Sequence, residues 1–280
     1  MKKPLFILLI AYCLLPNLAT AQQKRMVTFE DIASNTFAQK SVQNVNWMKD
    51  GAFYTALKDG EIIKYRVTDG TMLESLFNEN SVNPSIKIDE YFLSADEQQI
   101  LIATKREAIY RRSSKAIFYL YDLKTKTLKP LSAGGKQQNA QFSPDGKKVA
   151  FCRDNNLFWV NVASMKESQI TKNGKFNETI NGSTDWVYEE EFGFARAFWW
   201  SPDSQKLAFI TFDESKVKEY NMQKWGELYP KDYRFKYPKA GDLKLIKNDN
   251  WFVEARLSAN FYNYEAFRVW VTPSAFVRSI

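Results

Sequence analysis

The chain has 280 residues, of which 45% are hydrophobic, 15% aromatic and 25% charged. This composition is ample for a folded core and excludes a disordered chain. The formal net charge is +7, but the positive residues are scattered, with pairs at 105–106, 111–112 and 147–148. They form no block interleaved with aromatic residues, so no nucleic-acid partner is expected.

The first 21 residues are predicted to be a secretory signal peptide. Lys2 and Lys3 precede an apolar segment, residues 4–18, that is too short and too interrupted to span a bilayer. The small residues of Ala19-Thr20-Ala21 match a cleavage site. We therefore expect a secreted or periplasmic protein with no membrane span after cleavage. An uncleaved membrane anchor is the alternative.

The sequence contains no histidine, which restricts the chemistry that these residues can perform. Neither a Ser-His-Asp nor a Cys-His arrangement can be assembled within the chain, and histidine-ligated metal sites are excluded. No cofactor or metal site is predicted. Cys152 is the one cysteine beyond the signal segment, and it lies in the apolar run "KKVAFCRD". We expect it to be a core residue rather than a nucleophile.

Four segments of the chain repeat one pattern: an aromatic residue or leucine, a turn containing aspartate, then an apolar strand. The turn aspartates are Asp50, Asp96, Asp145 and Asp203, which are 46, 49 and 58 residues apart. Turns such as "SPDG" favour hairpins, and the flanking segments alternate apolar and polar residues. With about four short strands per repeat, the pattern predicts an all-β fold, a partial β-propeller of three to four four-stranded blades. An open β-sandwich is the alternative.

An insertion at residues 172–196 lengthens the last repeat interval. The strand alternation stops there, and "TDWVYEEEFGFAR", residues 184–196, predicts a short helix. Thr184 or Asp185 would be its N-cap, with the glutamates near its start, where the helix dipole favours them. Insertions that depart from a repeat are where a scaffold usually carries function.

Three interpretations of Glu189, Glu190 and Glu191 compete. A charge run is most often a solvated helix end. Calcium binding is weakly supported, because the run lacks spaced oxygen ligands and a glycine turn. The third interpretation is capture of a cation, to which each of two carboxylates would contribute about 4 kcal/mol at ~4 Å and an effective dielectric near 20, before desolvation. Trp186, Tyr188 and Phe192 would partly shield the carboxylates, and Trp186 and Tyr188 are the expected supporting residues of such a site.

Four motifs resemble the dipeptidyl peptidase IV branch of the prolyl oligopeptidase family. They are "YRRSSKAIFYLYDL" (110–123), "NGSTDWVYEEEF" (181–192), "FWWSPDSQKLAF" (198–209) and "YPKAG" (237–241). Their order and spacing match, and the resemblance covers roughly residues 27–241. It implies an N-terminal eight-bladed propeller and a C-terminal α/β-hydrolase domain. It also implies a serine-type activity that removes Xaa-Pro or Xaa-Ala dipeptides from free N-termini.

The resemblance also implies roles for individual residues. Glu190 and Glu191 would hold the α-ammonium of the peptide, and Glu189 would pack or pair within the propeller. Arg111 would contact a backbone carbonyl of the peptide, with Arg112 the less favoured choice. If the ammonium is pinned, only a bond two residues along can reach a fixed nucleophile, so the propeller would set the length of the released dipeptide.

We expect a signal peptide at 1–21, the N-terminal portion of a propeller at 22–241, and a divergent tail at 242–280, such as truncation or a frameshift would produce. Without the hydrolase domain, these residues alone are expected to be inactive. The family resemblance further implies a peptide substrate as partner, and a homodimer, as full-length members often form. The alternative function is a non-catalytic propeller or sandwich that binds a cell-surface protein or glycan.

Overall fold

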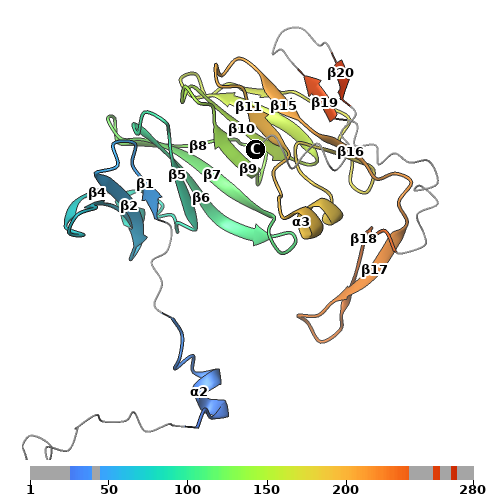
Figure 1. The fold of residues 1–280 in the computed structure, drawn as a ribbon, viewed down its shortest axis with the longest axis horizontal. Coiled ribbons are helices and arrows are strands. Elements are labelled where there is room, and N and C mark those ends of the chain that lie inside the picture. Colours follow the sequence, from blue (N-terminus) through green and yellow to red (C-terminus); the bar gives the residue numbers. More distant parts are fainter. Residues whose placement is uncertain (1–25, 40–44, 240–254, 259–265, 270–280) are drawn as a thin grey trace, which may run out of the picture. The chain divides into compact units, whose positions relative to one another are not determined.

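The computed structural model describes residues 26–39 and 45–239, together with the backbone of two strands at 255–258 and 266–269 (Figure 1). The predicted signal peptide lies outside the described residues. The chain divides into two units, residues 1–42 and 43–280. In the first, the short helix α2 (Phe29–Ala33) starts at a capping box, in which the Thr28 hydroxyl accepts from Asp31 N and the Asp31 carboxylate accepts from Thr28 N.

The larger unit contains three four-stranded antiparallel sheets, in each of which neighbouring strands follow one another along the chain. The first sheet comprises β1 (Asn46–Trp47), β2 (Phe53–Lys58), β3 (Glu61–Arg66) and β4 (Met72–Asn78). The second comprises β5 (Glu90–Leu93), β6 (Gln99–Ala108), β7 (Ser114–Asp122) and β8 (Thr127–Pro130). The third comprises β9 (Gln138–Phe142), β10 (Lys148–Arg153), β11 (Asn156–Asn161) and β12 (Glu167–Gln169).

Shorter elements follow β4 and β12. A 3-10 turn, η1 (Glu79–Ser81), comes directly after β4. The remaining strands form antiparallel pairs: β13 (Thr179–Asn181) with β16 (Thr211–Asp213), β14 (Phe198–Trp200) with β15 (Leu207–Phe209), β17 (Glu219–Lys224) with β18 (Lys231–Lys236), and β19 (Ala255–Ser258) with β20 (Ala266–Val269). Between β13 and β14 lies the helix α3 (Trp186–Phe192). Apart from β19 and β20, the predicted tail lies outside the described residues.

The four predicted aspartate turns each join the first two strands of a repeat. In every one the aspartate Oδ1 accepts a hydrogen bond from the backbone N–H two residues on, at 2.9 to 3.1 Å. The residue after the aspartate takes a positive φ in all four turns: Gly51 (69°), Glu97 (58°), Gly146 (70°) and Ser204 (62°). The turn geometry therefore persists where glycine is replaced, because the aspartate contact is retained.

Successive sheets pack face to face, as propeller blades do. On β6, Ile100 and Ile102 contact the first sheet, whereas Leu101 and Ala103 on the opposite face contact the third, and all four are at most 1% exposed. The expected apolar-polar alternation is wrong for this strand, because both of its faces are buried. In an open sandwich each sheet would bury one face, so the stacking confirms the partial propeller.

The third sheet repeats this arrangement. Val149 and Phe151 of β10 face the second sheet, whereas Ala150 and Cys152 face the β14–β15 pair. Cys152 is 1% exposed, as predicted for a core residue. Burial raises the pKa of its thiol to about 12, so the sulfur stays protonated and unreactive near neutral pH.

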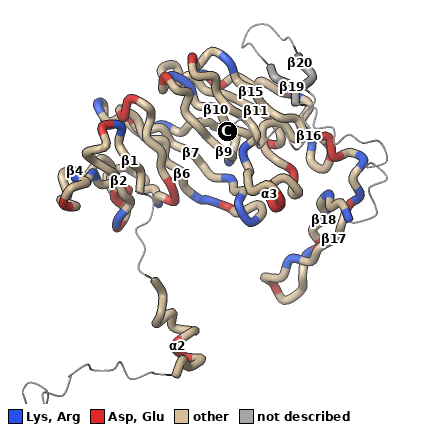
Figure 2. Tube along the Cα trace, viewed as in Figure 1, with Lys and Arg blue, Asp and Glu red and all other residues tan. Residues whose placement is uncertain are grey.

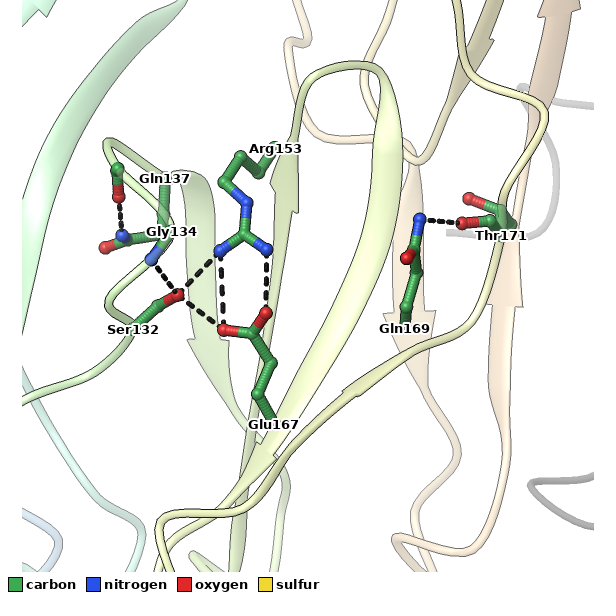
Figure 3. A network of polar contacts seen from close by, with 8 residues as sticks. Ser132, Gly134, Gln137, Arg153, Glu167, Gln169 and Thr171 are labelled. Atoms are coloured by element: carbon green, nitrogen blue, oxygen red, sulfur yellow. Dashed lines mark hydrogen bonds and ion pairs between the residues drawn. The ribbon is translucent and has the colours of Figure 1, made fainter.

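An ion pair between β10 and β12 of the third sheet also holds Ser132, in the segment that leads into this sheet (Figure 3). Arg153 Nη2 lies 2.7 Å from Glu167 Oε1, and Arg153 Nη1 donates to Ser132 Oγ at 2.6 Å. The Ser132 hydroxyl also donates to Glu167, which closes the network. A Cβ at Gly134 would collide with the Arg153 guanidinium, so a larger residue there would displace this side chain from its present position.

Candidate functional site

The predicted helix in the insertion is present as α3, and Asp185 is its N-cap. The Asp185 carboxylate accepts from Tyr188 N at 2.8 Å, which satisfies one of the free N–H groups at the helix start. The helix ends at Gly193, which takes the left-handed conformation at φ 76°. These two caps confine the helix to seven residues and place all three glutamates within it.

Aromatic side chains anchor α3 on the rest of the unit. The Tyr188 ring meets Phe212 of β16 edge-on, with centroids 4.8 Å apart. The Trp186 ring packs on Tyr237 at 4.5 Å and on Phe235 of β18 at 6.4 Å. Tyr237 begins the "YPKAG" motif, so two motifs that are 45 residues or more apart in the sequence are in contact here. Trp186 and Tyr188 thus hold the helix in place.

Glu189 faces inward and is 1% exposed. Its Oε1 accepts hydrogen bonds from the backbone N–H groups of Arg112, at 2.6 Å, and Ser113, at 2.8 Å. Both donors lie in the turn between β6 and β7. The carboxylate therefore fixes the hairpin tip to the helix.

The same hairpin tip brings Arg111 to Glu190. Arg111 Nε lies 3.1 Å from Glu190 Oε2, and their side chains are 75% and 16% exposed. Glu191 is exposed, and within the described ranges no hydrogen bond or ion pair to its carboxylate is present. Consecutive helical residues point about 100° apart, so the two carboxylates flank one edge of α3. Figure 2 shows the blue hairpin tip beside the red residues of α3.

Behind the helix lies a buried carboxylate that the sequence did not reveal. Burial raises the pKa of Glu214 to about 7, the nearby Asp185 adds to the rise, and Lys236 opposes it. Burial also raises the pKa of Asp185. Next to Arg111, the hydroxyl of Tyr110 has a raised pKa because it is buried and hydrogen bonds with Tyr233. No motif marks Glu214, because its environment comes from segments distant in sequence.

The comparisons with known proteins agree on one family. A sequence model described as the dipeptidyl peptidase IV (DPP IV) N-terminal region matches residues 94–250, more than half of the chain. The chain belongs to the dipeptidyl peptidase IV N-terminal region family. The resemblance inferred from its motifs is therefore confirmed.

Individual relatives of this DPP IV N-terminal region include enzymes of fungi, mammals and bacteria. It is 40% identical over 164 residues to a probable dipeptidyl-aminopeptidase B of Chaetomium globosum, covering 53% of this chain and 18% of the relative. It is 33% identical over 247 residues to dipeptidyl peptidase 4 of Felis catus, covering 84% of this chain and 32% of the relative. The crystal structure of Porphyromonas gingivalis dipeptidyl peptidase 4 superposes with a TM-score of 0.73 and 41% identity, covering 78% and 32%.

The DPP IV N-terminal region described here thus spans at most about a third of the length of these relatives. Among the described residues, no helix is long and apolar enough to cross a membrane. The structure brings Arg111, Glu189 and Glu190 together and leaves Glu191 facing solvent. The role of these residues toward a peptide stays a prediction.

Proposed function

We propose that α3 and the β6–β7 tip bind the free N-terminus of a peptide, with Glu190 and Glu191 holding the α-ammonium. The contact between Arg111 and Glu190 carries this proposal. It places one cation against the first carboxylate and leaves the second uncompensated, so the cluster retains a negative charge. Arg111, largely exposed, is free to turn toward a backbone carbonyl of the bound peptide.

Rigidity favours this role. Two caps and two ring contacts hold the helix, and buried Glu189 holds the hairpin, so the backbone that carries both carboxylates is already in place when a ligand arrives. An ammonium held at a fixed point sets the distance along the peptide to any reacting group. The alternative interpretation, that the glutamates form a solvated helix end, does not account for the β6–β7 hairpin tip that Glu189 holds against the helix.

The wider proposal is that this region serves a secreted or periplasmic serine-type dipeptidyl peptidase, which releases Xaa-Pro and Xaa-Ala dipeptides. It rests on membership of the family, on the charge arrangement at α3 and on the signal pattern in residues 1–21. The propeller would supply recognition of the peptide N-terminus. Bond cleavage would come from a hydrolase domain with its own serine, aspartate and histidine.

Titration calorimetry with the tripeptide amide Ala-Pro-Ala tests the ammonium site. We expect Glu190→Gln and Glu191→Gln each to weaken binding about tenfold or more, because each removes a charge next to the ammonium. N-acetylation of the peptide should have a similar effect and should abolish sensitivity to both variants. Glu74→Gln, at an exposed position of β4, is the matched control. Equal binding of free and acetylated peptides would reject the ammonium role.

We also propose that the full protein forms homodimers through the β17–β18 hairpin. The turn of this hairpin exposes Trp225 (74%), Leu228 (89%) and Tyr229 (79%), an apolar group too prominent for a purely solvated tip. Trp225→Ser combined with Leu228→Ser should shift the molar mass in light scattering from dimer to monomer. An unchanged mass in this double variant would argue against the hairpin as the dimer contact.

A further inference from the structure

A cavity of about 670 Å³ lies beside the glutamate site, between three successive repeats of the unit. Its walls come mainly from β5, β9 and β14, the first strands of the second, third and fourth repeats, with β6 and β7 closing one side. This volume is in the range of pockets that hold small molecules or a few residues of a peptide. The aromatic part of the lining consists of Phe92, Phe118, Phe142, Trp199 and Trp200.

The charged side chains in the lining are mostly positive. Three arginines, Arg106, Arg112 and Arg196, line the cavity, whereas Glu90 is the one acidic residue in the lining. Within the described residues, none of the three guanidinium groups forms an ion pair, although the Asp89 carboxylate accepts the Arg106 backbone N–H at 2.8 Å and the Glu189 carboxylate accepts that of Arg112 at 2.6 Å. By contrast, Arg153 of the neighbouring β10 forms a bidentate pair with Glu167. The lining of the cavity thus carries more positive than negative side chains.

Arg196 is the most constrained of the three. It precedes β14, and its Nε is buried without a hydrogen-bond partner within the described part of the chain. Its guanidinium lies 5.9 Å from the Phe198 ring centre, and burial lowers the pKa of Arg196. Gln141, also in the lining, has a buried amide oxygen without a partner. A guanidinium that is partly buried without an anion is costly, so the arrangement is suited to receiving one.

Arg112 links the cavity to the glutamate site, because it lines the cavity and lies on the hairpin tip that Glu189 holds. This residue follows Arg111 in the chain, and its backbone N–H is held by Glu189. Its guanidinium lies about 4 Å from the position that a Cβ on Gly193, the C-cap of α3, would occupy. One hairpin tip therefore presents Arg111 to the glutamates and Arg112 to the cavity.

We propose that this arginine-lined cavity is a subsite for a carboxylate of the same peptide whose ammonium binds at Glu190 and Glu191. This inference rests on the proposed function. Two sites of opposite charge, side by side on one scaffold, match the two charges that a peptide carries. Guanidinium groups bind carboxylates through paired, charge-assisted hydrogen bonds, and the aromatic lining accommodates the apolar chain between the charges. The carboxylate comes either from an acidic side chain or from the C-terminus of a short peptide.

Calorimetry with four peptides separates these sources in the 280-residue chain. The reference is Ala-Pro-Ala amide, which has no carboxylate. Ala-Pro-Ala with a free C-terminus adds a terminal carboxylate, whereas Glu-Pro-Ala amide and Ala-Pro-Glu amide each add an acidic side chain. We expect at least one of the three carboxylate peptides to bind about tenfold more tightly than the reference. The peptide that gains identifies the source, and an equal affinity of all four overturns the proposal.

Two variants test the arginines themselves. Arg196→Gln and Arg106→Gln should each remove most of the carboxylate advantage while leaving the affinity for the reference amide within twofold. Arg106 is a surface-facing position whose replacement is tolerated more easily, so the test survives if Arg196→Gln does not fold. Arg66→Gln, in the first sheet, is the matched control and should retain the advantage. An advantage that persists in both cavity variants overturns the proposal.

The design also distinguishes failure of the subsite from failure of the ammonium site. N-acetylated versions of the carboxylate peptides lose only the ammonium contact. If acetylation has no effect but the carboxylate advantage still depends on Arg106 and Arg196, the cavity binds anions and the proposed ammonium site is wrong. If acetylation weakens binding and the carboxylate has no effect, the ammonium site stands and the cavity proposal is overturned.

Discussion

Glu189 and Arg112 are 77 positions apart in the sequence, yet the Glu189 carboxylate accepts the Arg112 backbone N–H at 2.6 Å. The adjacent Ser113 N–H donates to the same oxygen at 2.8 Å. The contact joins a helix of the insertion to the tip of a hairpin in the second sheet. Glu190 follows Glu189 in the chain, and Arg111 precedes Arg112. The contact therefore also brings the side chains of Arg111 and Glu190 within ion-pairing distance.

Replacing Glu189 should destabilise the fold. Glu189→Ala leaves two backbone donors without their acceptor, and we expect a loss of about 2 kcal/mol in the free energy of unfolding, measured by urea denaturation. Glu191→Ala, at the neighbouring exposed position, is the control and should change that free energy by less than about 0.5 kcal/mol. Equal effects of the two changes would show that the Glu189 contact contributes nothing.

The Arg153–Glu167 pair should make stability depend on pH in acid. Burial acts to raise the pKa of Glu167, but hydrogen bonds from Arg153 and Ser132 outweigh it, and the pKa is lowered. A carboxyl with a lowered pKa stabilises the fold above its unfolded pKa, and this stability is lost as pH falls through the folded value. Glu167→Gln should therefore cost about 1–2 kcal/mol near pH 7 and much less near pH 3 in urea denaturation. A cost that does not vary with pH would contradict this.

Glu214 should make the stability of the fold depend on pH in the opposite sense to Glu167. Its pKa is raised from its ordinary value of 4.5 to about 7 in the fold, first by burial and then by Asp185. The folded state therefore binds the Glu214 proton more tightly than the unfolded state does. The contribution of this carboxyl to the free energy of unfolding declines as pH rises from about 4.5 to 7. Glu214→Gln removes this loss, so we expect it to stabilise the protein by up to about 3 kcal/mol at pH 8 relative to pH 4.

The control for this titration is Glu227→Gln, at an exposed turn where Glu227 pairs with Lys231. Thermal or urea unfolding at both pH values measures the difference between each variant and the parent chain. Comparing differences cancels the carboxyl groups that do not interact with Glu214; Asp185, whose pKa burial also raises, responds to acid in the same sense as Glu214. A Glu214→Gln difference that is the same at pH 4 and pH 8 would show that this carboxyl is not the raised group.

Gly182 should tolerate no side chain. It has φ 76°, and a Cβ there would lie 2.9 Å from Cys152 Sγ and 3.0 Å from Leu157 Cδ1, inside the core. Gly51 has a similar φ of 69°, but a Cβ there would meet nothing within 4 Å. In urea denaturation we expect Gly51→Ala to cost about 1 kcal/mol from backbone strain, and Gly182→Ala about 3 kcal/mol because overpacking adds to it. Similar costs would mean that the core yields at Gly182.

Much of this fold was predictable because its signals are local. The aspartate turns set their own geometry through contacts within a few residues, so their four positions marked the start of each repeat. The caps of α3 are equally local: Asp185 bonds three residues along, and Gly193 takes a conformation that few other residues adopt. The motifs around the glutamates identified the family for the same reason, since they lie in short continuous stretches.

Which face of each element is buried depended on the tertiary structure. The alternation expected along β6 fails because Ile100 and Leu101 are both covered, each by a different neighbouring sheet. The sequence marked Glu189, Glu190 and Glu191 as one charge run, but folding gives them three environments: buried, paired with Arg111, and exposed. Burial and electrostatic potential are summed over segments distant along the chain. The sequence by itself therefore determined which ionisable side chains are present at the site. Only the packing of distant segments determined which of them is buried, which is paired and which is exposed.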